Sequence, residues 1–345
     1  MNIKAIIIPP VTCKNCGSTA VVKFGSYKGV PRYWCKACQR KFKADSTLFH
    51  MKTPPEQISS ALSMYYSGMS INEIRNHLRQ ENGNYPSSKT VYGWIDKYTD
   101  LAIKSTGDYH PHVGDTWVAD ETVLRIDGQN VWMYDIIDEK TRFLLATRIA
   151  LSRTSHHAQM LMEEASKKAG KIPKKIITDK NFAYLDGIES AFGADTEHVQ
   201  SRPFAHEENT QLIERFHGTL KDRTKVMRGL KDIQTANQFT EGFLVHYNYF
   251  RPHESLHGKT PAEESEIDYR YKNWAEIIRQ PVSKQVEIIT HQTPKVRLLK
   301  SHIRLPETHV GRPRKRPRRN TGGIYASRSG DMMSRHPFRG ARRIA

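Results

Sequence analysis

Three acidic residues, Asp120, Asp179 and Glu214, occupy positions where a carboxylate could do chemistry. Asp120 falls within a strand-like segment, on its apolar face, and an acid that faces a core is costly unless it is paired or binds a metal ion. Asp179 follows the apolar run 176–178, at the strand end where α/β sheets place ligands. Glu214 lies in a helix-like segment, one position off the apolar stripe. Any one of these acids alone would more often be solvated or salt-bridged, so a metal site requires that all three meet.

The segment around these acids has the pattern of a mixed sheet. Strands are expected at 116–126, 131–137, 143–151, 174–178 and 196–201, and helices at 152–168, directly after Asp179 and from near Asn209. Asp127-Gly128 between the first two strands is a hairpin signal, and Ser152 and Gly170 suit the start and the end of the first helix. Three antiparallel strands followed by alternating helices and strands predict an α/β sheet flanked by helices. The neighbouring acids that we expect to be solvated or salt-bridged are Glu121, on the opposite strand face, Asp135, Asp138 and Glu208.

Several short motifs accompany the acids. They are Asp120-Glu121-Thr122, Ile177-Thr178-Asp179-Lys180, Asn209 with Leu212-Ile213-Glu214-Arg215-Phe216, and, downstream, Tyr247-Asn248-Tyr249-Phe250-Arg251-Pro252-His253 with the segment from Leu256 to Ala262. In combination they resemble the DDE transposases of bacterial and archaeal insertion sequences, part of the retroviral-integrase superfamily. The 34 residues between Asp179 and Glu214, and Lys221 two helical turns after Glu214, also match that pattern. The resemblance covers about residues 114–263 and implies an RNase H-like catalytic core.

The resemblance implies a reaction and a set of roles. Phosphoryl transfer on DNA uses two hard cations about 4 Å apart, and carboxylates suit Mg²⁺ or Mn²⁺. We expect Asp120 to bridge both ions, and Asp179 and Glu214 to complete one each. Water would attack first and free a 3′ end, and that 3′-hydroxyl would then join a target strand. Lys180 and Lys221 are candidate phosphate contacts, and Asn209 is a candidate helix cap or site-orienting amide.

The four cysteines of the chain form two close pairs, Cys13 with Cys16 and Cys35 with Cys38. This spacing predicts a tetrahedral thiolate cage around one structural Zn²⁺. Buried or disulfide-bonded cysteines are the alternative. A segment this short has almost no core, so the metal would supply the folding energy. Lysines, arginines and aromatic residues crowd around the pairs, which suits a phosphate-contacting surface, although a solvated basic face on a purely structural module explains them too.

A second candidate DNA-binding unit follows the cysteines. Residues 56–66 predict a helix, Ser70 with Glu73 forms a capping box for the next helix, and a third helix begins at Ser87 or Ser88. Three short helices joined in this way are typical of a helix-turn-helix unit, and a plain helical linker bundle is the alternative. Within the third helix, the candidate DNA contacts are Lys89, Thr90 and Tyr92.

The net charge of +18 points to a polyanionic partner, and it is unevenly distributed. Residues 291–345 hold 15 Lys and Arg against Glu307 and Asp331, so this tail supplies +13 of the +18. Within it, the run 311–319 resembles a minor-groove AT-hook, except that Val310 stands where the first Arg would be. A disordered polycation that holds DNA through phosphates explains the same residues. Its candidate contacts are Arg312, Arg314, Lys315 and Arg316.

The sequence therefore predicts a multidomain protein with a small zinc ribbon at 1–50, an all-α helix-turn-helix domain at 51–105, an α/β RNase H-like core at 113–268, and a linker with a basic tail at 269–345. A signal peptide or membrane span is not evident, which with the resemblance suggests a prokaryotic, cytoplasmic, nucleoid-associated protein. DNA ends and target DNA are the expected partners, with self-association implied by the resemblance. A non-catalytic DNA-binding regulator and a metal-dependent nuclease that cuts without joining are the alternatives.

Overall fold

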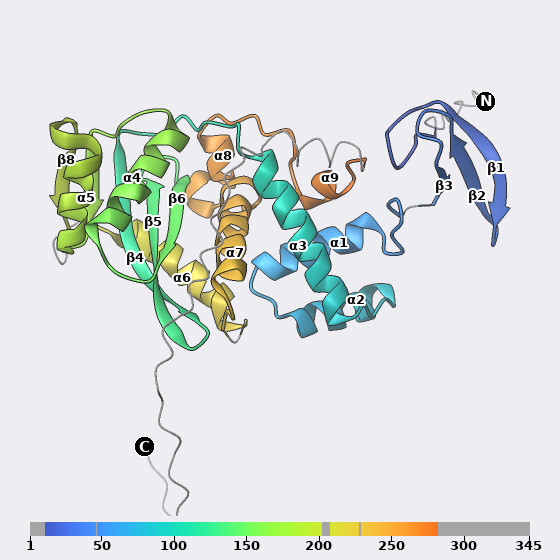
Figure 1. Cartoon of the computed structure of the whole chain (residues 1–345), viewed down its shortest axis with the longest axis horizontal. Helices are drawn as coiled ribbons and strands as arrows, with labels where there is room; N and C mark the ends of the chain where they lie inside the picture. Colours follow the sequence, from blue (N-terminus) through green and yellow to red (C-terminus); the bar gives the residue numbers. More distant parts are fainter. Residues whose placement is uncertain (1–10, 46, 202–207, 228, 282–345) are drawn as a thin grey trace, which may run out of the picture. The chain divides into compact units, whose positions relative to one another are not determined.

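The computed structural model describes residues 11–45, 47–201, 208–227 and 229–281. Three secondary-structure groups follow one another along the chain: a three-stranded sheet, a set of three helices, and a larger sheet with helices on both faces (Figure 1). The basic tail, with Arg312, Arg314, Lys315 and Arg316, lies outside the described residues. In the described part of the chain, none of the helices combines the length and apolar character needed to cross a membrane.

The larger sheet confirms the expected α/β architecture. Its strands are β4 (Thr116–Ile126), β5 (Gln129–Asp138), β6 (Leu144–Ala150), β7 (Lys175–Thr178) and β8 (Glu197–Gln200). They lie in the order β6-β5-β4-β7-β8. β4, β5 and β6 pair antiparallel, whereas β7 and β8 add in parallel to β4. β4 is therefore the central strand, and β7 beside it ends directly before Asp179.

The turn between β4 and β5 fixes which residues face each other across the two strands. Asp127 and Gly128 both have positive φ, 48° and 77°, as a two-residue type I′ hairpin requires. The register that follows from this turn pairs Asp120 with Asp135. Since side chains alternate along a strand, directly paired residues share one face of the sheet. Two carboxylates thus lie side by side on the face that also carries Val118.

Helices cover both faces of this sheet. Those on one face are α4 (Ser155–Ala169) and α5 (Phe182–Phe192), and those on the other are α6 (Gln211–Lys225) and α7 (Ile233–Val245) (Figure 1). The expected helix start at Ser152 is wrong, because Thr154 is the N-cap of α4 and accepts its first backbone hydrogen bonds. Arg153, in the connection before it, is used in an ion pair with Glu121. The expected end at Gly170 is confirmed by its left-handed backbone, φ 68°.

The three helices before the sheet are α1 (Pro55–Tyr66), α2 (Ile71–Asn82) and α3 (Ser88–Ser105). The capping box that Ser70 and Glu73 predict is present at the start of α2. Ser87 is the N-cap of α3 and accepts from the Thr90 N–H at 3.1 Å. The helices bury one apolar face each, as their sequence periodicity requires, and pack on one another.

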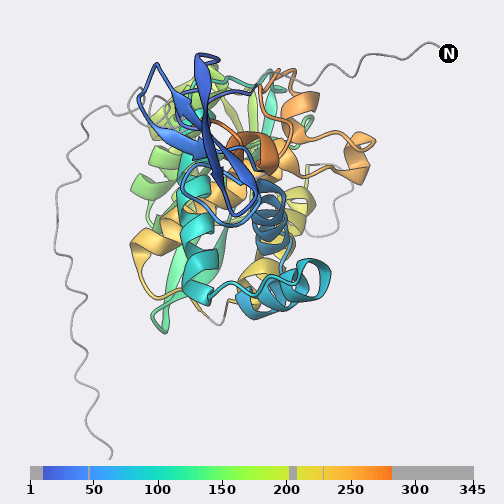
Figure 2. The ribbon, with the colours of Figure 1, turned by 90° about the vertical axis from the view of Figure 1, so that its right-hand side faces the viewer.

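The cysteine segment forms a twisted antiparallel sheet of β1 (Val21–Tyr27), β2 (Val30–Cys35) and β3 (Lys41–Lys43) (Figure 2). Its buried residues are two of the cysteines, Cys13 and Cys35, and Phe42. Three buried residues are too few to fold a module by burial of apolar area alone. Cohesion here must therefore come from what joins the cysteines.

The chain after α7 consists of short elements, which are the π-helical turn η2 (His246–Phe250), the 3-10 turn η3 (Glu254–Leu256), α8 (Pro261–Glu264) and α9 (Trp274–Ile278). A further 3-10 turn, η1 (Gly193–Asp195), lies earlier in the chain, between α5 and β8. Asn248 in η2 is fully buried, and its side-chain amide bonds both the N–H and the C=O of Leu144 at 2.9 Å. This pair of hydrogen bonds ties the end of α7 to the start of β6.

Candidate active site

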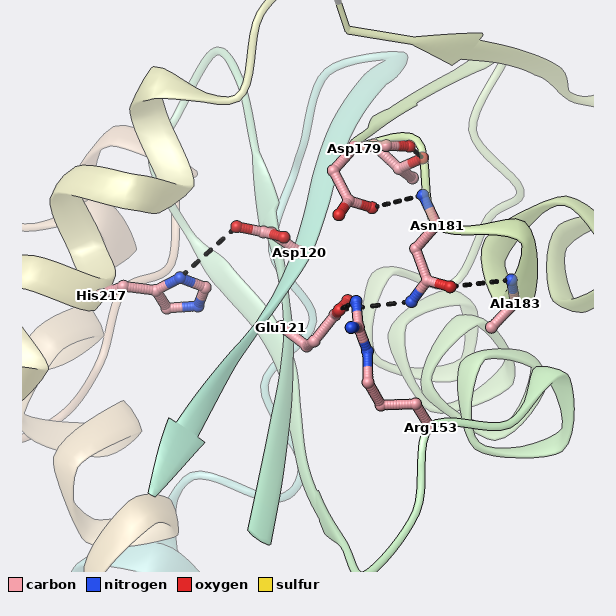
Figure 3. Close-up of polar contacts among 8 residues, drawn as sticks. Asp120, Glu121, Arg153, Asp179, Asn181, Ala183 and His217 are labelled. Atoms are coloured by element: carbon pink, nitrogen blue, oxygen red, sulfur yellow. Dashed lines mark hydrogen bonds and ion pairs between the residues drawn. The ribbon is translucent and has the colours of Figure 1, made fainter. Parts of the chain in front are cut away.

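Three carboxylates meet where β4 passes the end of β7. Asp120, Glu121 and Asp179 each present an oxygen, and these oxygens all lie within 4.8 Å of one another (Figure 3). Asp120 and Glu121 come from successive positions of β4 and point to opposite sides of the sheet, while Asp179 projects from the strand end above them (Figure 3). The structure therefore brings together two of the acids expected at the site, with Glu121 as a neighbour that the sequence pattern discounted.

Asn181 holds the upper side of this group. Its backbone N–H donates to Asp179 Oδ1 at 2.9 Å, and its side-chain Nδ2 donates to Glu121 Oε1 at 3.2 Å. Asn181 Oδ1 in turn accepts from the Ala183 N–H, so the residue also caps α5. Arg153 adds an ion pair to the same Glu121 oxygen. The carboxylates of Asp179 and Glu121 are thus fixed by the start of one helix and by the connection into another.

His217 on α6 lies on the face of the sheet to which Asp120 points, opposite Glu121 and Asn181 (Figure 3). Its Nε2 lies 2.9 Å from Asp135 Oδ2, and its Nδ1 lies 3.7 Å from Asp120 Oδ2. His217 is 4% exposed and Asp135 is fully buried. Asp135 is therefore not solvated; it is a buried partner of the histidine. The imidazole spans the two carboxylates that the β4–β5 register pairs.

The sequence interpretation missed His217, although two signals could have found it. The Asp127-Gly128 turn fixes the register and makes Asp135 the partner of Asp120. His217 lies three residues after Glu214, which places the two side chains on the same helical face. A buried acid beside a second acid requires a partner, and a helical histidine on the acid-bearing face is the natural candidate.

Electrostatics leave this group of carboxylates short of positive charge. Burial, opposed by His217 and helped by the charges of Asp179, Glu214 and Asp135, raises the pKa of Asp120 to about 7. Glu121 Oε2 is buried without a hydrogen-bond partner within the described ranges. A donor set made only of carboxylate oxygens fits hard cations such as Mg²⁺ or Mn²⁺. A bound divalent cation would relieve the repulsion that burial creates.

Glu214 lies near this group but is not part of it. Its side chain is exposed, and Glu214 Oε1 accepts from Thr210 Oγ1 at 3.0 Å. The residue lies one helical turn before His217, on the side of α6 that faces Asp120, and it contributes to the raised pKa of that acid. Lys180 and Lys221 are exposed, and the Asn209 side chain accepts from the Gln211 N–H at 3.0 Å.

The other acids that the sequence interpretation set aside have partners of their own. Asp138 is fully buried and accepts from the N–H and the hydroxyl of Thr141, both at 2.7 Å. Glu208 forms an ion pair with Lys175 at 2.5 Å. Neither acid belongs to the group of carboxylates around Asp120.

The four cysteines converge on one point. Cys13 Sγ lies 3.6 Å from Cys38 Sγ, and Cys16 Sγ lies the same distance from Cys35 Sγ. Metal–sulfur bonds of about 2.3 Å in a tetrahedron give sulfur–sulfur edges of about 3.8 Å, so this set fits zinc. None of the four forms a disulfide. The backbone N–H groups of Cys38 and Ala37 lower the pKa of the Cys35 thiol to about 7, which favours the thiolate that a metal needs.

The three candidate DNA contacts on α3 all lie on the surface. Lys89 and Thr90 are exposed in its first turn, and Tyr92 is 55% exposed. An exposed aromatic residue beside a lysine offers both a stacking face and a phosphate contact. The described geometry therefore leaves this face of α3 open to a ligand.

Comparison with known proteins places the acids within one family domain. Residues 114–253 match the family model described as a DDE domain. Two Staphylococcus aureus proteins, the transposase for insertion sequence-like element IS431mec of strain N315 and the transposase for insertion sequence element IS257 in transposon Tn4003, are each 24% identical to this chain over 202 residues. The aligned part is 58% of this chain and 87% of each relative. The matched domain contains Asp120, Asp179 and Glu214.

Solved structures of integrase cores are also similar to this chain. The HTLV-2 integrase catalytic core domain in complex with magnesium, in its trimeric form, is 18% identical, with a TM-score of 0.36; the match covers 45% of this chain and 97% of that chain. The catalytic core domain of BIV integrase is 15% identical, with a TM-score of 0.35, and the match covers 44% of this chain and 94% of that chain.

Proposed function

We propose that this chain, which is a DDE transposase of the integrase superfamily, cuts and joins DNA strands at two metal ions held by Asp120, Asp179 and Glu214. The observation that carries the proposal is the half-buried Asp120, whose carboxylate oxygen lies within 4.8 Å of oxygens from two other acids and whose pKa is raised to about 7. Glu214 would enter the site by exchanging its hydrogen bond from Thr210 for a metal. The movement needed is a side-chain rotation, because the residue already lies on the side of α6 that faces Asp120.

The reaction would proceed as two displacements at phosphorus. In the first, a water oxygen forms a bond to the scissile phosphorus, and the bond to the 3′ oxygen breaks and leaves a 3′-hydroxyl. In the second, that 3′-hydroxyl attacks a phosphorus of the target strand and displaces its 3′ oxygen. Bound Mg²⁺ or Mn²⁺ would activate the attacking oxygen and stabilise the leaving oxygen.

The protein groups would orient the reactants. Asp120 would bridge the two ions, held in place by His217, which in turn is held by Asp135. Asn181 would fix Asp179 through the hydrogen bond of 2.9 Å. Lys180 and Lys221, both exposed, would contact phosphates on either side of the scissile bond.

The remaining segments would serve DNA binding. Residues 1–50 would form a zinc ribbon on Cys13, Cys16, Cys35 and Cys38, and residues 51–105 a helix-turn-helix domain that meets the element ends through Lys89, Thr90 and Tyr92. Residues 113–268 would be the catalytic core, and the tail from 269 would add affinity through Arg312, Arg314, Lys315 and Arg316. Two copies of the chain would act on paired ends, at the DNA of a bacterial nucleoid.

One experiment separates this function from that of a nuclease that only cuts. The full chain is incubated with Mg²⁺, a target plasmid and a duplex taken from the DNA that flanks its coding sequence, ending in either a 3′-hydroxyl or a 3′-dideoxy residue. Joined products from the hydroxyl end and none from the dideoxy end are expected, since the attacking oxygen is missing in the second. Cleavage without joined products from either end would contradict the proposal.

A further inference from the structure

A cavity opens on the same face of the sheet as Asp120. Its volume is about 310 Å³, and it lies between the start of α6, the β5–β6 turn and the segment after η2. Three arginines line it, Arg142 from the turn, Arg215 from α6 and Arg251 from the last segment. Glu139 is the one acid among the lining residues that the structure describes. The cavity therefore carries an excess of positive charge.

None of the three arginines forms an ion pair or a side-chain hydrogen bond with another residue in the described ranges. Arg142 and Arg251 are nonetheless half-buried, and only Arg215 is exposed. Their charges converge on Tyr247 at the cavity wall: burial raises the pKa of this phenol to about 12, and Arg251, Arg142 and Arg215 all oppose the rise. Guanidinium groups without acidic partners that share one cavity are typical of a site for a phosphate or carboxylate.

The local backbone holds these arginines in place. Arg142 has a left-handed backbone, φ 61°, and its N–H donates to the Asp138 carbonyl at 3.0 Å. Such a conformation costs energy in a residue with a side chain and persists where the surroundings enforce it. The Arg251 N–H donates to the His246 carbonyl at 2.9 Å. Asn248 binds Leu144, so the segment with Arg251 is tied to the strand that follows Arg142.

His253 completes the wall without adding charge. Its ring lies edge-on to Tyr247, with 4.5 Å between ring centroids, and its Nε2 lies 3.4 Å from the Tyr247 carbonyl oxygen. Burial, aided by Arg251 and Arg142, lowers the pKa of His253 to about 4. The imidazole is therefore neutral in neutral solution. The motif from Tyr247 to His253 thus has a physical role, which is to build one side of an arginine-lined cavity.

The cavity lies close to the catalytic acids. Val118 lines it and precedes Asp120 by two residues on the same face of β4, a separation of about 7 Å along a strand. Phosphates of one DNA strand rise about 3.4 Å per nucleotide along the helix axis. A strand with one phosphate at Asp120 can therefore place another phosphate, one or a few nucleotides away, in the cavity.

We propose that Arg142, Arg215 and Arg251 form a binding site for a backbone phosphate of the DNA strand that lies next to the scissile phosphate. This site rests on the proposed function, because it assumes that a DNA strand lies at Asp120. The N-terminus of α6, a helix of 15 residues, begins in the cavity wall at Gln211 and adds a field that favours an anion. The site holds the strand in register and takes no part in breaking bonds.

The test is a scan of single neutral phosphates. The full chain, without added Mg²⁺, is titrated with duplexes that each carry one methylphosphonate near the cleaved end, and the scan is repeated with Arg251→Gln. At one or two positions, we expect the neutral phosphate to weaken DNA binding by the wild-type chain about tenfold. At the same positions it should not weaken DNA binding by Arg251→Gln any further. The salt dependence of the DNA affinity should also show that Arg251→Gln releases about one ion fewer on binding than the wild-type chain does. If every methylphosphonate weakens binding by Arg251→Gln as much as it weakens binding by the wild-type chain, the proposal is overturned.

Two further variants control for charge and folding. Arg142→Gly removes a cavity arginine while keeping a residue that tolerates the left-handed backbone, so it repeats the test if Arg251→Gln lowers the melting temperature. Arg125→Gln removes an exposed arginine of β4 outside the cavity. The site is supported if the same methylphosphonate position loses its effect on binding in Arg142→Gly and keeps that effect in Arg125→Gln. Equal masking by Arg125→Gln would reduce the effect to general charge and overturn it.

Inorganic phosphate distinguishes the source of the anion. A site for a DNA phosphate predicts weak competition by inorganic phosphate and a clear methylphosphonate position. A phosphate-dependent rise in melting temperature that Arg251→Gln abolishes, with no sensitive DNA position, would indicate a free-phosphate site and contradict the DNA assignment. Failure of the proposed function is separate, because it would appear as strand joining by Asp120→Asn, whatever the binding scan gives.

Discussion

His217 Nε2 lies 2.9 Å from Asp135 Oδ2, in the interior between α6 and the sheet, while the other nitrogen of the ring faces Asp120 Oδ2 at 3.7 Å. Asp135 is fully buried, and among the described residues His217 is the side chain that its carboxylate bonds. An acid that orients a histidine, which in turn orients a metal-binding carboxylate, is a common support for metal sites. The arrangement explains how the half-buried Asp120 carboxylate keeps one orientation.

Replacement of His217 by glutamine should lower strand joining by about 10-fold to 100-fold, because Asp120 loses its support while the acids remain. DNA affinity should not change, since His217 is buried and offers no surface to a ligand. The Mg²⁺ concentration for half-maximal joining should rise, a shift that a general loss of stability would not produce. His217→Gln with wild-type joining at low Mg²⁺ would show that the ring is only a packing residue.

Glu121 and Glu214 are the two candidates for the carboxylate that completes the metal site with Asp120 and Asp179. Glu121 is held by Arg153 and Asn181, whereas Glu214 is exposed and accepts a hydrogen bond from the Thr210 hydroxyl. A rotation that breaks this one hydrogen bond would turn Glu214 toward a metal. We expect Glu214→Gln to abolish joining and Glu121→Gln to lower it about tenfold, the size of effect expected for a supporting group. Joining by each variant is measured at equal DNA occupancy. Abolition by Glu121→Gln with activity left in Glu214→Gln would exchange the two roles.

Much of this site could be predicted from local sequence signals. Strand β4, the Asp127-Gly128 turn and the end of β7 before Asp179 follow from apolar patterns and turn chemistry, and the structure has them where those patterns predict. The place of Glu121 could not be predicted in the same way. Strand alternation sends it to the opposite face, but its carboxylate still reaches the same group because Asn181 and Arg153 draw it there from two other elements. Contacts between distant segments of this kind leave no periodic signal.

The prediction that α4 begins at Ser152 was wrong for a related reason. Serine before an apolar stripe is a good N-cap signal, but Thr154 offers an equivalent position two residues later. The start at Thr154 leaves Arg153 in the connection before the helix, where it pairs with Glu121. Local propensity alone ranks such neighbouring caps almost equally.

His246 should make the protein sensitive to acid. It is buried against Trp274 and Tyr66, and burial lowers its pKa from 6.5 to about 3. Between those pH values the unfolded chain binds a proton that the folded chain does not, so the free energy of unfolding falls as the pH falls. The slope from this group is at most about 1.4 kcal/mol per pH unit.

The variant His246→Phe should flatten that slope between about pH 6 and pH 4, as measured by urea unfolding at each pH. Above about pH 7 the curves of the two proteins should run parallel, because the histidine is neutral in both states. Equal slopes of the two proteins in the acid range would assign the acid sensitivity to other groups.

The cysteine module should depend on zinc. Cys35→Ser, or treatment with a chelator, should unfold β1 to β3, because the module has only three buried core residues to hold it. Limited proteolysis should then cut within residues 11–45, and metal analysis should find about one zinc fewer per chain. The sheet around Asp120 should resist proteolysis as before. Protection of the cysteine module after complete zinc removal would contradict the metal assignment.

Strand joining by Asp120→Asn tests the central claim most directly. The wild-type chain and the variant are brought to equal occupancy on DNA with a free 3′-hydroxyl, Mg²⁺ is added, and joined products are followed over time. Asn keeps the shape of the side chain and removes the charge, so DNA binding should be retained while joining falls by at least about 1000-fold. Joining at a rate close to that of the wild-type chain would contradict a metal site built on Asp120.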